Sequence, residues 1–178
     1  WLQVTPSSLS AIPSHLESAQ ALDSVTSKVG IGVITPHTIV IDLDLGFDIK
    51  FTNQKVRLLG IDTPESRTSD KVEKVFGLAS KDFVKKFVAV CKNHVIIRTH
   101  ISEGTDDSGR EKFGRLLAEI INPDTKEVLN DQLISKNYAV KYMGENKLAV
   151  KDNHMANRKI LIDRGDVKMD YKVAGLAG

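Results

Sequence analysis

The chain has 178 residues, of which 41% are hydrophobic, with 25 Lys and Arg against 23 Asp and Glu. A chain of this length suits one domain that buries a core without disulfides or metal staples. Its single cysteine, Cys91, cannot form an internal disulfide, and no Cys/His cluster has zinc-ligand spacing. No apolar run approaches the ~20 residues that span a bilayer. We therefore expect neither a membrane protein, nor a zinc finger, nor a disulfide-stabilised miniprotein.

Charge is distributed unevenly along the chain. Residues 1–54 contain two Lys against five acidic residues, whereas residues 55–178 contain 23 Lys and Arg against 18 acidic residues. The basic bias of the second segment fits contact with a polyanion such as nucleic acid, and it equally fits an ordinary solvated surface. Residues 1–20 lack the basic start and apolar run of a secretory signal. The compartment stays open, with a cytoplasmic location favoured over secretion.

The chain order predicts a compact domain over residues 29–165. Residues 1–28, rich in Ser and Ala, predict an N-terminal arm or linker, and residues 166–178 predict a C-terminal tail. Period-two runs predict strands at residues 29–34, 38–51 with a break at Leu45-Gly46, 55–61, 94–100 and 113–121. Helical periods predict helices from Asp70 to Val90, at residues 128–136 and at residues 151–163. This order predicts an α+β fold with a five-stranded OB-type β-barrel and three helices.

The most informative segment is the run VRLLGIDTPES at residues 56–66. Asp62 ends an apolar strand, Pro64 cannot continue the ladder, and Glu65 lies in the turn that follows. Two acids three residues apart at such a boundary can converge on one hard cation, which takes oxygen ligands from carboxylates and backbone carbonyls. The alternative is an ordinary turn in which Asp62 accepts hydrogen bonds from the backbone.

A second informative segment is the run GREKFGRLLA at residues 109–118. Arg115 enters a strand directly after a hairpin turn, and a guanidinium at that place can fork onto a phosphate. By itself, an Arg at a strand start more often pairs with a surface acid. This segment alone therefore leaves both interpretations open.

Together, the two segments closely resemble the staphylococcal nuclease (thermonuclease-like) family. Its RLL-x-x-DTPE motif lies in the run that starts at Arg57, and its K-[YF]-G-R motif lies in the KFGR run that ends at Arg115. Further matches lie in the KVEKVFGLASKDFVKK and LNDQLISKNYAVKY runs, and the resemblance covers residues 29 to 163. The DLGF run at residues 44–47 and the YMG run at residues 142–144 are similar to the branch of the family found in phages and mobile elements.

The resemblance implies a calcium-dependent phosphodiesterase that acts on DNA and RNA. It implies that Arg57 and Arg115 are catalytic arginines and that Glu65 positions or deprotonates the attacking water. It also implies that Asp62 binds the metal through its side chain and Thr63 through its backbone carbonyl. Chemistry agrees with these roles, because charge that develops on phosphoryl oxygens calls for fixed cationic donors and the water needs a base or a metal.

One position departs from the family pattern. The family normally has Asp-Gly-Asp-Thr before its second strand, with the second Asp as a metal ligand, whereas this chain has Thr35-Pro36-His37-Thr38. Imidazole is a poor ligand for Ca²⁺ and suits a cation such as Mn²⁺ better. Three interpretations stay open: weakened metal binding with slow catalysis, an inactive binding or structural module such as a phage component, and an altered metal. The other histidines considered are interpreted as surface or packing residues: His94, His100 and His154.

Overall fold

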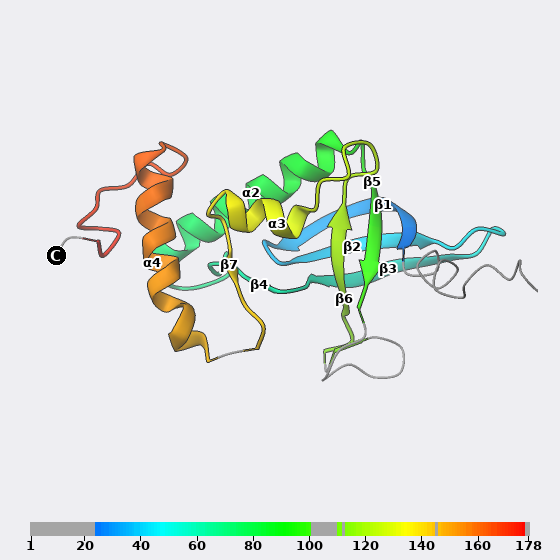
Figure 1. Ribbon diagram of the computed structural model, residues 1–178, viewed down its shortest axis with the longest axis horizontal. Coiled ribbons are helices and arrows are strands. Elements are labelled where there is room, and N and C mark those ends of the chain that lie inside the picture. The colour runs from blue at the N-terminus through cyan, green and yellow to red at the C-terminus, as the bar shows by residue number, and fades with distance from the viewer. Residues whose placement is uncertain (1–23, 101–109, 112, 145, 177–178) are drawn as a thin grey trace, which may run out of the picture.

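A computed structural model describes residues 24–100, 110–111, 113–144 and 146–176. The strands are β1 (Ser24–Thr35), β2 (Thr38–Asp44), β3 (Lys50–Leu58), β4 (Ile61–Asp62), β5 (His94–Thr99), β6 (Leu116–Ile121) and β7 (Val140–Lys141). The helices are α2 (Lys71–Val90), α3 (Leu129–Ser135) and α4 (Lys147–Asp163). The long strands occupy one side of the molecule and α4 the other, with α2 running between them (Figure 1).

Five strands close into a barrel in the order β1-β2-β3-β6-β5. All neighbours run antiparallel except β3 and β6, which run parallel. The first strand closes the barrel, because Ser27 lies opposite Leu43 of β2 on one side and opposite Val95 of β5 on the other. A five-stranded Greek-key barrel of this kind is the OB architecture. The predicted α+β fold, with a five-stranded OB-type barrel and three helices, is confirmed.

Several element bounds differ from those predicted. The first strand begins at Ser24 rather than at residue 29, and Ser24 pairs with Arg98 of β5. The strand predicted to end at residue 61 is interrupted at Gly60, where φ is +73° and favours glycine. The chain then continues as β4, which pairs with β7 in a small separate sheet. Residues 24–28 of the predicted arm therefore belong to β1, whereas its residues 1–23 and the predicted turn at residues 103–109 lie outside the described residues.

Helix α2 connects the barrel to the rest of the molecule. It begins after Asp70, whose carboxylate accepts hydrogen bonds from the backbone N–H groups of Val72 and Glu73 and so caps the helix. Toward its end, Val84 and Val88 belong to the barrel core, so this side of the helix faces the strands.

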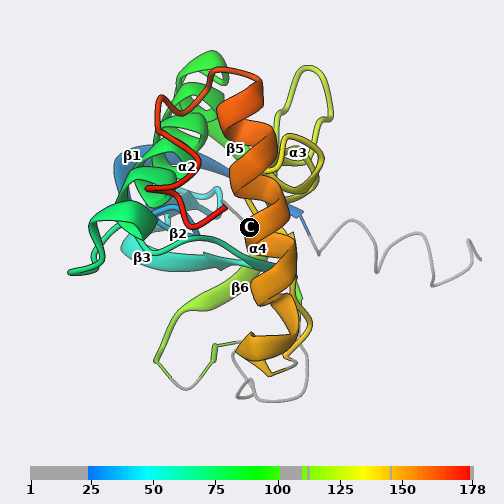
Figure 2. The ribbon, with the colours of Figure 1, turned by 90° about the vertical axis from the view of Figure 1, so that its left-hand side faces the viewer.

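A second, smaller core lies beside the barrel. It contains Phe76 of α2, Leu161 of α4, Val167 and Ala174, all of them buried. Figure 2 shows the segment after α4 lying alongside α2. The part of the predicted tail up to residue 176 therefore packs on the domain, because burying its apolar side chains against two helices stabilises it there.

Candidate active site

The barrel brings three separate sequence segments together at one place. The turn between β1 and β2 holds His37, whose carbonyl accepts a 2.9 Å hydrogen bond from the N–H of Leu58. Thr38, the next residue, lies opposite Arg57 in the β2–β3 ladder. The parallel pairing of β3 with β6 places Arg57 opposite Leu117, close to Arg115 along the chain. The two predicted catalytic arginines thus come from neighbouring strands, beside the turn that carries the departure from the family motif.

Arg115 is held from two sides. Its Nε donates to Oε1 of Glu111 at 2.7 Å, and its Nη1 donates to the hydroxyl of Thr38 at 3.3 Å. Burial is the largest single influence and by itself would raise the pKa of Glu111, but the hydrogen bond and charge of Arg115, together with hydrogen bonds from the backbone, hold that pKa below its ordinary value. Arg115 does pair with an acid, yet the pair is mostly buried beside the catalytic candidates instead of lying on the open surface.

Arg57 is desolvated and lies near a second positive charge. Its Nη2 donates to the carbonyl of Ile61 at 3.4 Å, and within the described part of the chain no ion pair joins it to a carboxylate. Burial lowers the pKa of Arg57, and the charge of Arg115 lowers it further. More distant carboxylates oppose this shift: those of Asp62, Glu111 and Glu65. Two neighbouring guanidinium groups in a partly buried site favour an anionic ligand.

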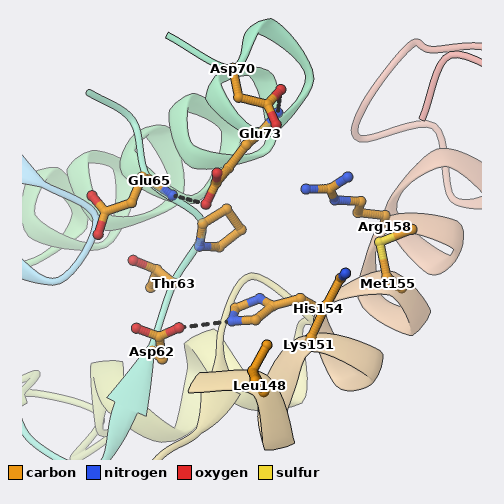
Figure 3. A pocket seen from close by; sticks show the side chains of 11 residues that line it. Asp62, Thr63, Glu65, Asp70, Glu73, Leu148, Lys151, His154, Met155 and Arg158 are labelled. Carbon is orange, nitrogen blue, oxygen red and sulfur yellow. Dashed lines mark hydrogen bonds and ion pairs between the residues drawn. The ribbon is translucent and has the colours of Figure 1, made fainter. Parts of the chain in front are cut away.

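Helix α2 fixes the backbone of Glu65. The N–H of Glu65 donates to Oε1 of Glu73 at 3.2 Å. A Cβ atom at Gly77 would lie 2.6 Å from the carbonyl carbon of Glu65 and from the nitrogen of Ser66, so this close approach requires glycine. Figure 3 shows the carboxylate of Glu65 and the hydroxyl of Thr63 turned away from α4.

Asp62 is bound from the opposite side by α4. It is 7% exposed, and its Oδ2 lies 2.9 Å from Nε2 of His154. Because an ionised carboxylate only accepts hydrogen bonds, Nε2 of His154 is the donor. The interpretation of His154 as a surface or packing residue is therefore corrected. The two residues are 92 positions apart in the sequence, and no spacing pattern links them.

Two pockets lie along the segment of residues 57–65, one beside residues 57–61 and the other beside residues 62–65. One has a volume of about 390 Å³ and lies between residues 62–65, the start of α2, and α4 (Figure 3). The other has a volume of about 320 Å³ and is lined by Arg57, Leu117 and Tyr142, among others. An anion can reach Arg57 through the second pocket, whereas His154 lines the first.

Comparison with known families agrees with this geometry. Residues 55–160 match the family described as "Staphylococcal nuclease homologue", and this match covers more than half of the chain. The chain belongs to the staphylococcal nuclease homologue family. A search of curated proteins finds no significant match, so the comparisons give no support to the phage and mobile-element branch. Among the helices of the described residues, none has the length and apolar character needed to cross a membrane.

The calcium site implied by the family does not fit the residues of this staphylococcal nuclease homologue. Nδ1 of His37 lies 2.9 Å from the hydroxyl of Thr63, and both residues are buried. His37 is therefore next to the residues predicted to hold the metal, and it offers an imidazole where the resemblance leads one to expect a carboxylate. The described residues contain no group of three or more His, Cys, Asp or Glu side chains that could hold a metal ion. Ca²⁺ takes six to eight oxygen ligands, several of them carboxylates, and Asp62 already binds His154.

Proposed function

We propose that this protein binds nucleic acid at Arg57 and Arg115 and hydrolyses its phosphodiester bonds slowly. The observation that carries the proposal is the pair of neighbouring guanidinium groups, one of them desolvated and outside any described ion pair. A phosphodiester supplies the negative charge that this pair favours, and its oxygens match the planar fork of a guanidinium.

The chemistry is assigned to residues of the chain itself. Arg57 and Arg115 donate hydrogen bonds to the non-bridging phosphoryl oxygens and stabilise the charge that develops there as water attacks. Glu65 orients the water and takes its proton as the new P–O bond forms. The P–O bond to one sugar oxygen breaks, and that oxygen takes a proton from solvent. Because the donor set does not fit Ca²⁺, we derive no step through a metal ion. Loss of one electrostatic stabiliser typically costs about 10²–10³ in rate, which is why we propose slow hydrolysis.

Two alternatives are kept. The first is an altered metal. Mn²⁺ binds an imidazole nitrogen more readily than Ca²⁺ does, so His37 favours Mn²⁺ over Ca²⁺ as the ion of a metal-dependent reaction. A second candidate function is a catalytically inactive module that binds nucleic acid or protein. It is favoured by the two hydrogen bonds, His37 to Thr63 and Asp62 to His154, that already engage the side chains around the expected metal position.

The test is binding and hydrolysis of labelled single-stranded DNA and RNA, with EDTA, Ca²⁺ and Mn²⁺ compared. We expect binding and slow cleavage in all three conditions, whereas cleavage that Mn²⁺ stimulates and Ca²⁺ does not would favour the altered metal. The variant Arg57→Ala should lose both binding and cleavage, whereas the control Arg98→Ala, at an exposed ion pair with Glu119, should keep them. Binding without cleavage in any condition would favour the inactive module. Absence of binding by the wild type would overturn the proposal.

A further inference from the structure

We infer that His154 takes the place of the family's calcium ion as the partner of Asp62, so that nucleic-acid binding by this protein does not require calcium. The inference concerns the same site and rests on the proposed phosphate-binding role of Arg57 and Arg115. It follows from three features of the structure: the anchoring of His154, the charge of the site, and the position of His154 relative to Arg57.

The first feature is the rigid attachment of His154 to the strand that carries Asp62. Asp62 lies opposite Val140 in the β4–β7 pair. One turn from His154 on α4, the side-chain amide of Asn157 donates at 3.1 Å to the carbonyl of Ala139, the residue before Val140. The same helix buries Leu161 in the second core. His154 is thus fixed against a buried carboxylate, which would be costly to bury without a partner.

The second feature is the balance of charge around Asp62. Of the two side chains that the resemblance assigns as metal ligands, only Asp62 is a carboxylate. The other, at His37, is an imidazole close to Thr63, and a second imidazole, that of His154, contacts Asp62. Calcium affinity falls as the number of negatively charged ligands falls. A calcium ion would also have to compete with His154 for Asp62. Both effects weaken calcium binding, and they act through different residues.

The third feature is that His154 leaves the phosphate site open. It lines the pocket of about 390 Å³ beside α4. Arg57 lines the other pocket, of about 320 Å³. We therefore expect a phosphate bound at Arg57 to leave the Asp62–His154 pair intact.

The first experiment measures calcium binding by calorimetry on the full chain. The wild type should show no binding at millimolar Ca²⁺, and His37→Asp should bind weakly. The double variant His37→Asp/His154→Leu should bind about tenfold more tightly than His37→Asp, because the competing hydrogen bond to the charged group is gone. His94→Asn is the matched control and should behave as the wild type, because the exposed side chain of His94 lies 3.0 Å from the carbonyl of Lys92, two residues before it in the sequence.

Melting temperatures establish that each variant is folded. If the variant with His154→Leu does not fold, His154→Asn serves instead, because its polar side chain is too short to reach Asp62. His154→Gln is longer and still offers an N–H donor, so its calcium binding should be the same as with His154 in place. Wild-type calcium binding as tight as that of the double variant would overturn the inference. So would weaker calcium binding by the double variant than by His37→Asp, because His154 would then support the cation instead of replacing it.

The second experiment measures binding of a labelled single-stranded oligonucleotide by fluorescence anisotropy, in a Glu65→Gln background that suppresses cleavage. Affinity should be the same in EDTA and in Ca²⁺ when His37 and His154 are present. A requirement for Ca²⁺ would overturn the inference. Absence of oligonucleotide binding in both conditions would instead overturn the proposed function, while the calorimetric result would still decide whether His154 excludes calcium.

Discussion

Gly77 of α2 lies so close to Glu65 that a Cβ atom on Gly77 would be 2.6 Å from the Glu65 carbonyl carbon. The same helix supplies Glu73, whose carboxylate accepts the hydrogen bond from the Glu65 N–H. The position of the proposed general base therefore depends on a helix that carries none of the other proposed catalytic groups.

We expect Gly77→Ala to displace the Glu65 segment and to destabilise the protein by about 1–3 kcal/mol, the usual cost of overpacking a dense contact. Displacing the base by about 1 Å should lower cleavage by about 10²-fold. Urea unfolding and single-turnover cleavage measure the two effects. Gly32→Ala is the control, because the nearest atom to its Cβ would be 4.0 Å away. Equal cleavage by the two variants would show that α2 does not position Glu65.

The proposed catalytic residues should act at the chemical step. Arg57→Ala, Glu65→Ala and Arg115→Ala should each lower kcat by about 10²–10³, with the barrel still folded by circular dichroism. Arg115→Ala also leaves Glu111 without its partner, so Arg115→Lys is tested beside it. Lysine keeps the positive charge but cannot donate the two parallel hydrogen bonds of a guanidinium. A residue whose removal leaves near-normal turnover does not belong to the mechanism.

Restoring the carboxylate at position 37 should raise calcium-dependent cleavage. His37→Asp adds one negative charge and one oxygen ligand beside Thr63, so Ca²⁺ should bind more tightly, and any preference for Mn²⁺ over Ca²⁺ should shrink. Cleavage measured across a titration of each ion tests this. His94→Asp adds the same charge at an exposed position and should change nothing. If His37→Asp also changes neither affinity nor rate, residue 37 is not a ligand position.

The Glu111–Arg115 pair should stabilise the fold in a pH-dependent way. The pKa of Glu111 in the folded state lies below its ordinary value of 4.5. The unfolded state then binds the proton more readily, so this stabilisation is present above about pH 4.5 and is lost as the pH falls through the folded-state pKa. The difference in unfolding free energy between wild type and Glu111→Gln should therefore be largest near neutral pH and shrink in acid. Asp82→Asn, at an exposed pair with Lys85, should show little difference at any pH.

Two truncations should distinguish the contribution of the N-terminal arm to stability from that of the first barrel strand. Deletion of residues 1–23 should leave the melting temperature nearly unchanged, as their Ser- and Ala-rich composition predicts. Deletion of residues 1–28 should lower it by several degrees, because Ser24 to Lys28 pair with Arg98 to His94 and close the barrel. A large drop in the shorter truncation would show that the arm itself stabilises the domain.

The sequence alone determined the features that depend on neighbours along the chain. Strand alternation predicted the barrel strands, although β1 extends further toward the N-terminus than predicted. The cap at Asp70 and the apolar period predicted α2. Arg57, Glu65 and Arg115 were predicted because they lie in short runs that resemble the family's motifs, and such runs are local in the sequence. The match to the family then required no knowledge of how the segments pack.

Only the tertiary structure decided what surrounds Asp62. His154 reaches it from a helix 92 positions away, and His37 meets Thr63 across 26 positions. Such contacts depend on how α4 packs on the β4–β7 pair and on how the β1–β2 turn is placed by the barrel. A histidine on a helix has the same local sequence pattern whether it faces solvent or a buried carboxylate. The physical reason is that burial and partnership are set by packing between distant elements, whereas periodicity and capping are set within one element.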